Sequence, residues 1–313
     1  MAIARLASAE GWVQHFGENR KRSVVTIGNF DGIHRGHQEI LRKVKQEARE
    51  RDQLAAVLTL FPHPLKVLRP AEAPSLLMTI DQRLAAFDAA GIDAALVLPF
   101  DLELSKMRPE DFARRYLVET MRASKVLVGE NFRFGHRQEG TVQLLEGYGR
   151  EWGFEVESVK ALTVDGTVAS STAVREALRG GRVADARRLL GRPFSLEGEI
   201  QTGTGQGRKL VVPTLNLQTE QEMLPQNGVY ATETVVNGEF YRSVTNIGVR
   251  PTFNGSSVTV ETHLFDFNQD LTGGKIEIRF LERLRDERKF ASVEELRDQV
   301  LKDIRGAKEF LRT

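Results

Sequence analysis

Short apolar runs alternate between Ser23 and about Val183 with stretches in which apolar residues recur at helical spacing. The expected strands are 24–27, 55–60, 94–98, 125–128 and 153–158, and the expected helices are 38–52, 81–90 and 109–120. Strands that are apolar throughout and alternate with helices are typical of a parallel sheet covered by helices. The first half of the chain is therefore predicted to be an α/β domain.

The pattern changes near Ala184. After a helical stretch over 184–190, glycines recur every few residues, and 229–236 and 239–246 flank the hairpin signal Asn-Gly. A further strand is expected at 275–280, and a final amphipathic helix at 292–311, opened by a Ser-x-x-Glu capping pattern. We predict an antiparallel β domain with a terminal helix, and divide the chain into residues 1–183 and 184–313.

Composition excludes several classes of protein. Lys and Arg total 44 against 43 Asp and Glu, and the net charge of +1 gives no reason to expect a nucleic-acid partner. The absence of cysteine excludes disulfide scaffolds, thiolate zinc sites and cysteine nucleophiles, and fits a reducing cytoplasm. The chain shows neither a signal-peptide core nor a run of about 18 apolar residues, so we expect no membrane partner.

Three glycines and two histidines coincide where a strand gives way to a helix. Gly28, Gly32 and Gly36 surround His34 and His37. Amides at a helix start, with glycines that permit close approach, form a phosphate site, and imidazoles can donate hydrogen bonds to phosphoryl oxygens. A histidine pair at this spacing is, taken alone, more often structural, and a metal site lacks supporting cysteines and histidines.

Two motifs in this half resemble those of a known family. His34-Arg35-Gly36-His37 resembles the HxGH motif of nucleotidyltransferases, and GNFDGIHRGH is similar to the opening of the bacterial bifunctional riboflavin kinase/FAD synthetase family. The stretch SSTAVR resembles that family's SSTxxR motif, although alone it also fits a plain helix cap. The resemblance implies catalytic roles for His34, His37 and Arg175, and ATP or phosphate contacts from Gly28, Asn29, Phe30, Gly36, Ser170, Ser171 and Thr172.

Two further segments would build the flavin pocket by this resemblance. They supply Phe61, Pro62 and His63 from FPHP, and Asn131, Phe132 and Phe134 from GENFRFG. The phenylalanine rings can stack on the flavin ring while the Asn131 amide forms hydrogen bonds with its polar edge. At least one of the phenylalanines also fits simple core packing. The implied reaction is adenylyl transfer from ATP to FMN, which releases pyrophosphate and needs no protein nucleophile.

The second half carries another candidate phosphate site. Gly205 and Gly207 precede Pro213-Thr214-Leu215-Asn216, a stretch that resembles the PTAN motif of the riboflavin kinase module. Taken alone the glycines fit ordinary β-turns, and the sequence of this stretch does not match the P-loop pattern. The resemblance implies Mg²⁺ ligands at Thr214 and Asn216, because hard cations prefer oxygen. Leu215 stands where the family has alanine.

A glutamate further on is the implied general base of the kinase. Glu261 lies in VETHL and would accept the proton of the riboflavin 5′-hydroxyl during attack on the γ-phosphorus of ATP. An exposed strand carboxylate is the alternative, and Asp266 and Asp270 are more simply loop acids. Thr272 departs from the family, which carries tyrosine before a single glycine.

The resemblance implies a nucleotidyltransferase-like domain with a Rossmann-like parallel sheet, then an antiparallel β-barrel riboflavin kinase domain with a carboxy-terminal helix. The implied enzyme makes FMN from riboflavin and then FAD, with ATP as co-substrate and Mg²⁺ as cofactor. Two alternatives stay open: only one activity is retained, or the chain is a non-catalytic flavin sensor. The oligomeric state is not indicated.

Overall fold

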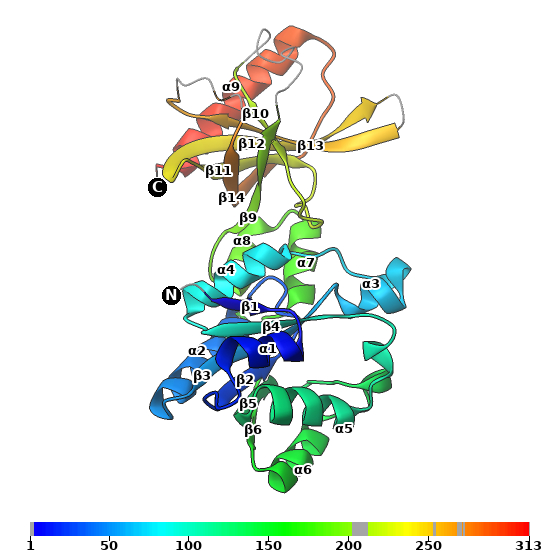
Figure 1. Ribbon diagram of the computed structural model, residues 1–313. Helices are drawn as coiled ribbons and strands as arrows, with labels where there is room; N and C mark the ends of the chain where they lie inside the picture. Colours follow the sequence, from blue (N-terminus) through cyan, green and yellow to red (C-terminus); the bar gives the residue numbers. More distant parts are fainter. Residues whose placement is uncertain (1–2, 202–211, 253–254, 268–270, 272, 313) are drawn as a thin grey trace. The chain divides into compact units, whose positions relative to one another are not determined.

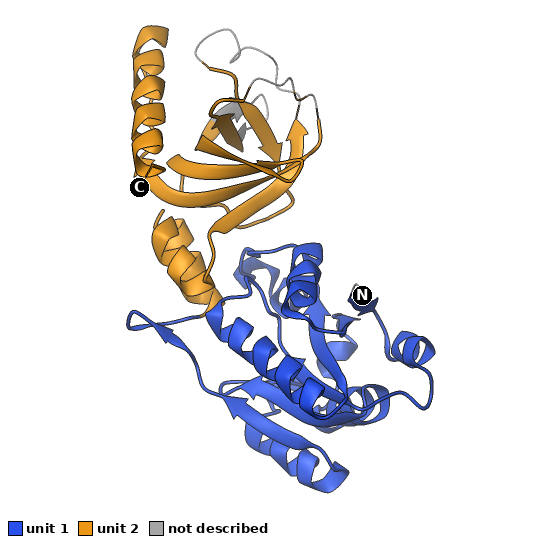
Figure 2. Cartoon of the chain, turned by 90° about the vertical axis from the view of Figure 1, so that its left-hand side faces the viewer, with its two compact units in different colours: residues 1–169 blue, residues 170–313 orange. Residues whose placement is uncertain are grey.

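The computed structural model describes residues 3–201, 212–252, 255–267, 271 and 273–312. Contacts within the chain divide it into two compact units, residues 1–169 and 170–313 (Figure 2). Within the described ranges, no helix is both long and apolar enough to cross a membrane.

The first unit is built on a six-stranded sheet in the order β1-β4-β3-β2-β5-β6, in which all neighbouring strands are parallel (Figure 1). Its strands are β1 Ala4–Leu6, β2 Ser23–Ile27, β3 Leu54–Phe61, β4 Ala94–Pro99, β5 Ala123–Gly129 and β6 Glu155–Val159. Its α-helices are α1 Ala9–Phe16, α2 Arg35–Glu50, α3 Pro64–Leu68, α4 Ile80–Ala90, α5 Pro109–Phe112 and α6 Val142–Trp152. A separate small pair is formed by β7 Thr163–Val164 and β8 Thr167–Val168.

The predicted parallel sheet is confirmed, with one strand added. The added strand, β1, was not predicted, because its three residues are too few to form an apolar run. The expected helix over 109–120 is corrected, since it is α-helical only to Phe112 and π-helical over Ala113–Thr120. The wider turn keeps Tyr116 and Leu117 buried, so the apolar pattern fits either helix type.

Both faces of the sheet are covered because its strands are apolar at every position. Val25 and Ile27 of β2 pack in one core cluster with side chains of α1, α5 and α6, and Val24 packs in the other with those of α2 and α4. Side chains alternate between the two faces along a strand, so continuous apolar runs need helices on both sides.

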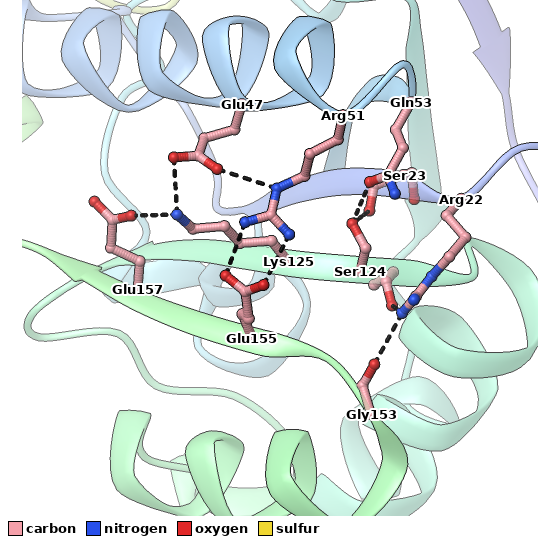
Figure 3. A network of polar contacts seen from close by, with 11 residues as sticks. Arg22, Ser23, Glu47, Arg51, Gln53, Ser124, Lys125, Gly153, Glu155 and Glu157 are labelled. Atoms are coloured by element: carbon pink, nitrogen blue, oxygen red, sulfur yellow. Dashed lines mark hydrogen bonds and ion pairs between the residues drawn. The ribbon is translucent and has the colours of Figure 1, made fainter.

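Ion pairs fix α2 to the sheet (Figure 3). Lys125 of β5 lies 3.0 Å from Glu47 of α2 and 2.7 Å from Glu157 of β6. Arg51, at the end of α2, contacts the same Glu47 at 3.2 Å and Glu155 of β6 at 2.8 Å. This network joins α2 to β5 and β6, in addition to the backbone pairing of the two strands and the apolar packing of α2.

The second unit contains a closed antiparallel barrel with strands in the order β10-β13-β12-β11-β14-β9. The strands are β9 Phe194–Gln201, β10 Leu215–Gln218, β11 Gly228–Val236, β12 Glu239–Thr252, β13 Gly255–Leu264 and β14 Lys275–Arg285. The helices are α7 Ser171–Arg179, α8 Val183–Leu190 and α9 Val293–Phe310. The predicted barrel and terminal helix are confirmed.

Local signals explain several boundaries in this unit. Asn237 and Gly238 have φ values of 53° and 85°, as the turn of a tight hairpin requires. The Ser292 hydroxyl accepts a hydrogen bond from the Glu295 amide at 3.1 Å and caps α9. On the barrel wall, α9 contacts β11 and β12, where Ala307 packs with Val244.

Candidate active sites

The strand order of the first sheet locates a ligand crevice. From β2 the chain moves outward through β3 to β4, and then returns to place β5 on the other side of β2. Ligands of open α/β sheets bind at such a switch point, beyond the carboxyl ends of the strands. Gly28–Phe30 follow β2 and 130–132 follow β5, so both predicted segments leave the sheet at this edge.

The two motif histidines lie at the start of α2. His34 is the N-cap residue, and its Nδ1 accepts a hydrogen bond from the His37 amide at 3.4 Å. The two rings stack with centroids 3.7 Å apart. A Cβ at Gly36 would lie 3.2 Å from the His34 ring and 3.5 Å from the carbonyl oxygen of Ala169, so glycine leaves room for both neighbours.

Burial sets the protonation of this pair. It lowers the pKa of His34 to about 4. The pKa of His37 is also lowered well below its usual value, first by burial and then by the neighbouring His34. Both imidazoles are therefore neutral near pH 7, and since Nδ1 of His34 accepts, its proton sits on Nε2. His34 can thus donate a hydrogen bond through Nε2.

The turn before α2 is held by a buried carboxylate. Asp31 is 3% exposed and accepts hydrogen bonds from the amides of Leu77 at 3.0 Å and Met78 at 3.1 Å. Phe30 and Ile33 beside it have positive φ values of 51° and 44°. Strained backbone of this kind persists where surrounding contacts hold it in place, and it clusters at functional sites.

The first predicted flavin segment lies at the end of β3. Phe61 is 38% exposed and is joined to Pro62 by a cis peptide bond. His63 caps α3, because its Nδ1 accepts a hydrogen bond from the Leu65 amide at 3.2 Å. Its Nε2 lies 3.2 Å from Nδ2 of Asn29, so the structure brings the predicted phosphate turn and flavin turn together.

The second flavin segment divides between surface and core. Asn131 is exposed and Phe132 is partly buried. Phe134 is only 7% exposed and packs in the core cluster, with its ring centroid 5.9 Å from that of Phe112. The Phe132 ring stacks on Phe134 at 5.4 Å, so Phe134 supports Phe132 from the core side.

The SSTxxR residues belong to the second compact unit. Ser170 is the N-cap of α7, and its hydroxyl accepts a hydrogen bond from the Ala173 amide at 3.2 Å. Ser171 and Thr172 form the first turn of α7, and Arg175 follows on the same helix and is 6% exposed. The meeting of these residues with His34 and His37 stays a prediction.

A polar row crosses three strands of the barrel. In the antiparallel register, Asn216 of β10 lies opposite Glu261 of β13, and Glu261 lies opposite Asn246 of β12. Directly opposed residues have Cβ atoms about 5 Å apart and share one face of the sheet. Leu215 lies opposite Thr262 and therefore leaves the sheet on the other face, so the departure from alanine does not obstruct the row.

Thr214 directly precedes β10 in the chain. The carbonyl oxygen of Pro213 lies 2.8 Å from Nδ1 of His263, a hydrogen bond that ties the start of the Pro213–Asn216 motif to β13. Asp266 lies apart in a turn with φ of 59°, and its side chain is 92% exposed. Glu261 is therefore the carboxylate that the barrel register aligns with Asn216.

Comparisons with known proteins find a family model for each half of the chain. A family model described as FAD synthetase matches residues 17–173, and one described as riboflavin kinase matches residues 190–311. A bifunctional riboflavin kinase/FMN adenylyltransferase of Escherichia coli is 37% identical over 92% of each chain. This chain belongs to the bifunctional riboflavin kinase/FMN adenylyltransferase family. The Bacillus subtilis relative of the same name is 34% identical and covers 91% of this chain and 92% of its own.

A solved structure extends the likeness to the whole fold. The protein titled macrolide-efflux protein from Streptococcus pneumoniae has a TM-score of 0.86 and 28% identity, over 98% of this chain and 99% of its own. The family resemblance inferred from the motifs is thus confirmed, and the domain models follow the predicted order along the chain.

Some predicted residues lie outside the described ranges, and some residues near the sites were not predicted. Gly205, Gly207, Asp270 and Thr272 lie among the residues that the structure does not describe. Asp31, Arg83 and His263 are not among the predicted site residues. Arg83 had a signal: it shares the buried side of α4 with Leu84 and Phe87, where a charge is unexpected.

Proposed function

We propose that this chain phosphorylates riboflavin with ATP in the barrel unit and adenylylates the FMN product with a second ATP at the α/β edge. Family membership with both domain models supports the two activities. The observation that carries the first site is the neutral histidine pair at the start of α2, at the switch point of the sheet.

In adenylyl transfer, the phosphate of FMN attacks the α-phosphorus of ATP and pyrophosphate leaves. Gly28–Phe30 and Gly36 let backbone amides approach the triphosphate, and His34 donates from Nε2 to a phosphoryl oxygen. Arg175 pairs with phosphate oxygens, and Ser170, Ser171 and Thr172 form the helix start beside it.

Phe61, Pro62, His63, Asn131 and Phe132 form the flavin side of that site, with Phe134 behind Phe132. The exposed face of Phe61 offers a stacking surface, and Asn131 is free of the core. FMN then approaches from the β3 and β5 ends, on either side of the β2 turn that holds ATP.

In the kinase reaction, Glu261 accepts the proton of the riboflavin 5′-hydroxyl as the oxygen attacks the γ-phosphorus of ATP. The oxygens of Thr214 and Asn216 would hold Mg²⁺, a hard cation, and Asn216 lies opposite Glu261 in the strand register. When bound, that ion would neutralise phosphate charge during transfer. Gly205 and Gly207 are proposed to contact the ATP phosphates, and the boundary near 183 is proposed to separate the two activities.

One incubation tests the whole assignment. Purified protein with riboflavin, ATP and Mg²⁺ should accumulate FMN and then FAD, separated by chromatography. His37→Ala or Arg175→Ala should lower FAD formation about a hundredfold while phosphorylation of riboflavin continues. Accumulation of FMN alone would show that one activity is lost, and bound but unchanged riboflavin would favour a flavin sensor. A cytoplasmic location without nucleic-acid or membrane partners stays a prediction.

A further inference from the structure

Arg83 is a charged side chain on the apolar side of α4. It is 3% exposed, and its helix neighbours Leu84 and Phe87 belong to the core cluster. Arginine is almost never so buried unless it is paired. Burial lowers the pKa of Arg83, against the attraction of Asp31, and the guanidinium still stays charged at neutral pH. A charge kept here at such cost indicates a role for its contacts.

The contacts of Arg83 all lead to the carboxyl edge of the sheet. Its Nη1 donates to the main-chain oxygen of Asn29 at 2.8 Å. Its guanidinium carbon lies 5.7 Å from the centre of the Phe61 ring, within reach of a cation–π interaction. Among the described residues, its buried Nε has no hydrogen-bond partner. Besides the attraction of Asp31, the guanidinium therefore has one hydrogen-bonded carbonyl and one aromatic ring as partners.

Both contacts act on the same turn. Arg83 contacts Phe61 directly. It is linked to His63 through Asn29, because Nδ2 of Asn29 lies 3.2 Å from Nε2 of His63. The side chain of His63 is in turn fixed at the start of α3 by the Leu65 amide. Arg83 thus holds the turn at Phe61 and at His63, two residues apart.

We propose that Arg83 is a positioning residue for the flavin ring in adenylyl transfer. The buried Arg83 lies over the Phe61 ring, and Phe61, which is 38% exposed as a residue, presents a surface of defined orientation to FMN. This inference rests on the proposed function, which assigns Phe61 and His63 to the flavin. In the part of the chain that the structure describes, Arg83 contacts none of His34, His37 and Arg175, and its one link to the proposed ATP turn is the hydrogen bond to the main-chain oxygen of Asn29.

The test compares two substitutions and a matched control. Arg83→Met removes the charge and the hydrogen bond, and Arg83→Lys keeps the charge but loses the planar fork. For Arg83→Met, the KM for FMN in FAD formation should rise about tenfold or more, and the KM for ATP should rise less, because only the Asn29 hydrogen bond leads to the ATP turn. The KM of Arg83→Lys for FMN should lie between those of Arg83→Met and the parent.

Arg20→Met is the control because it also deletes a buried arginine from the first unit. Arg20 is 7% exposed and precedes the amino end of β2. Its Nε donates a hydrogen bond to the main-chain oxygen of Thr120 at 2.8 Å. Its KM for FMN should match the parent. A lower fraction of folded enzyme reduces kcat and leaves KM unchanged, so the KM for FMN separates positioning from stability.

Direct binding and a double-mutant cycle complete the test. Titration of FMN fluorescence should show the same loss of affinity for FMN. In the cycle, the rise in the KM for FMN of the double variant Arg83→Lys, Phe61→Leu should be smaller than the product of the rises in the two single variants. An unchanged KM and affinity for FMN in Arg83→Lys and Arg83→Met would overturn the inference, as would an equal rise in Arg20→Met. If Arg83→Met does not fold, Arg83→Lys and the cycle decide. Parent enzyme that forms no FAD would refute the proposed function, and the FMN titration would still test Arg83.

Discussion

Acid should destabilise the first unit through His34. In the native state burial holds its pKa at about 4, against the ordinary 6.5 expected once the chain unfolds. Between these values the unfolded state binds a proton that the native state does not, so native stability falls as the pH drops through this window. A shift of about 2.5 pH units corresponds to about 3 kcal/mol, of which about 2 kcal/mol is lost by pH 5.

The measurement is urea unfolding followed by tryptophan fluorescence. The only two tryptophans, Trp12 and Trp152, lie in the first unit, so their signal reports that unit alone. His34→Asn keeps an N-cap acceptor for α2 but cannot take up the proton. Subtracting its free energy of unfolding from that of the parent isolates the His34 contribution, and His15→Asn, at an exposed position on α1, controls for loss of an imidazole.

The expected difference between parent and His34→Asn shrinks by about 2 kcal/mol from pH about 7.5 to pH 5. A difference that stays constant within about 0.5 kcal/mol over this range would refute the reasoning. In that case His34 would not be a buried neutral imidazole, and donation from Nε2 at neutral pH would lose its physical basis.

Three further predictions concern the base, the ion pairs and the division of the chain. Glu261→Gln keeps the size of the side chain without its basicity, so riboflavin kinase kcat should fall about 10² to 10⁴-fold while FAD synthesis from supplied FMN continues; a change within about threefold would contradict the role of the base. Lys125→Met should destabilise the first unit by about 2 kcal/mol, less than the loss of a fully buried pair because the side chains of Glu47 and Glu157 are 25% and 31% exposed. Lys21→Met, from an ion pair whose side chains are 57% and 91% exposed, should cost less than about 0.5 kcal/mol, and equal effects in urea unfolding would reject the network. A fragment beginning at Ser170 should fold by circular dichroism and phosphorylate riboflavin, whereas one beginning at Ala184 cuts into α8; a folded but inert Ser170 fragment would place part of the kinase site in the first unit.

The sequence by itself determined the features that depend on neighbours along the chain. Continuous apolar strands predicted a covered parallel sheet, and the Asn237-Gly238 hairpin predicted an antiparallel pair, because strand faces and turn angles are local properties. The histidine motif could be placed at a helix start for the same reason: a strand, a glycine turn and a helix follow one another within a few residues.

Only the tertiary structure decided which distant residues meet and which charges survive burial. Barrel closure set the register that puts Asn216 and Asn246 beside Glu261, a choice among strand pairings that alternation along each strand does not resolve. Packing of α4 brought Arg83 to Asn29, 54 positions away in the chain, a contact that the position of Arg83 on the apolar side of the helix does not predict. The neutral state of His34 likewise follows from burial, because removal of water penalises a charge that the isolated sequence would carry at acid pH.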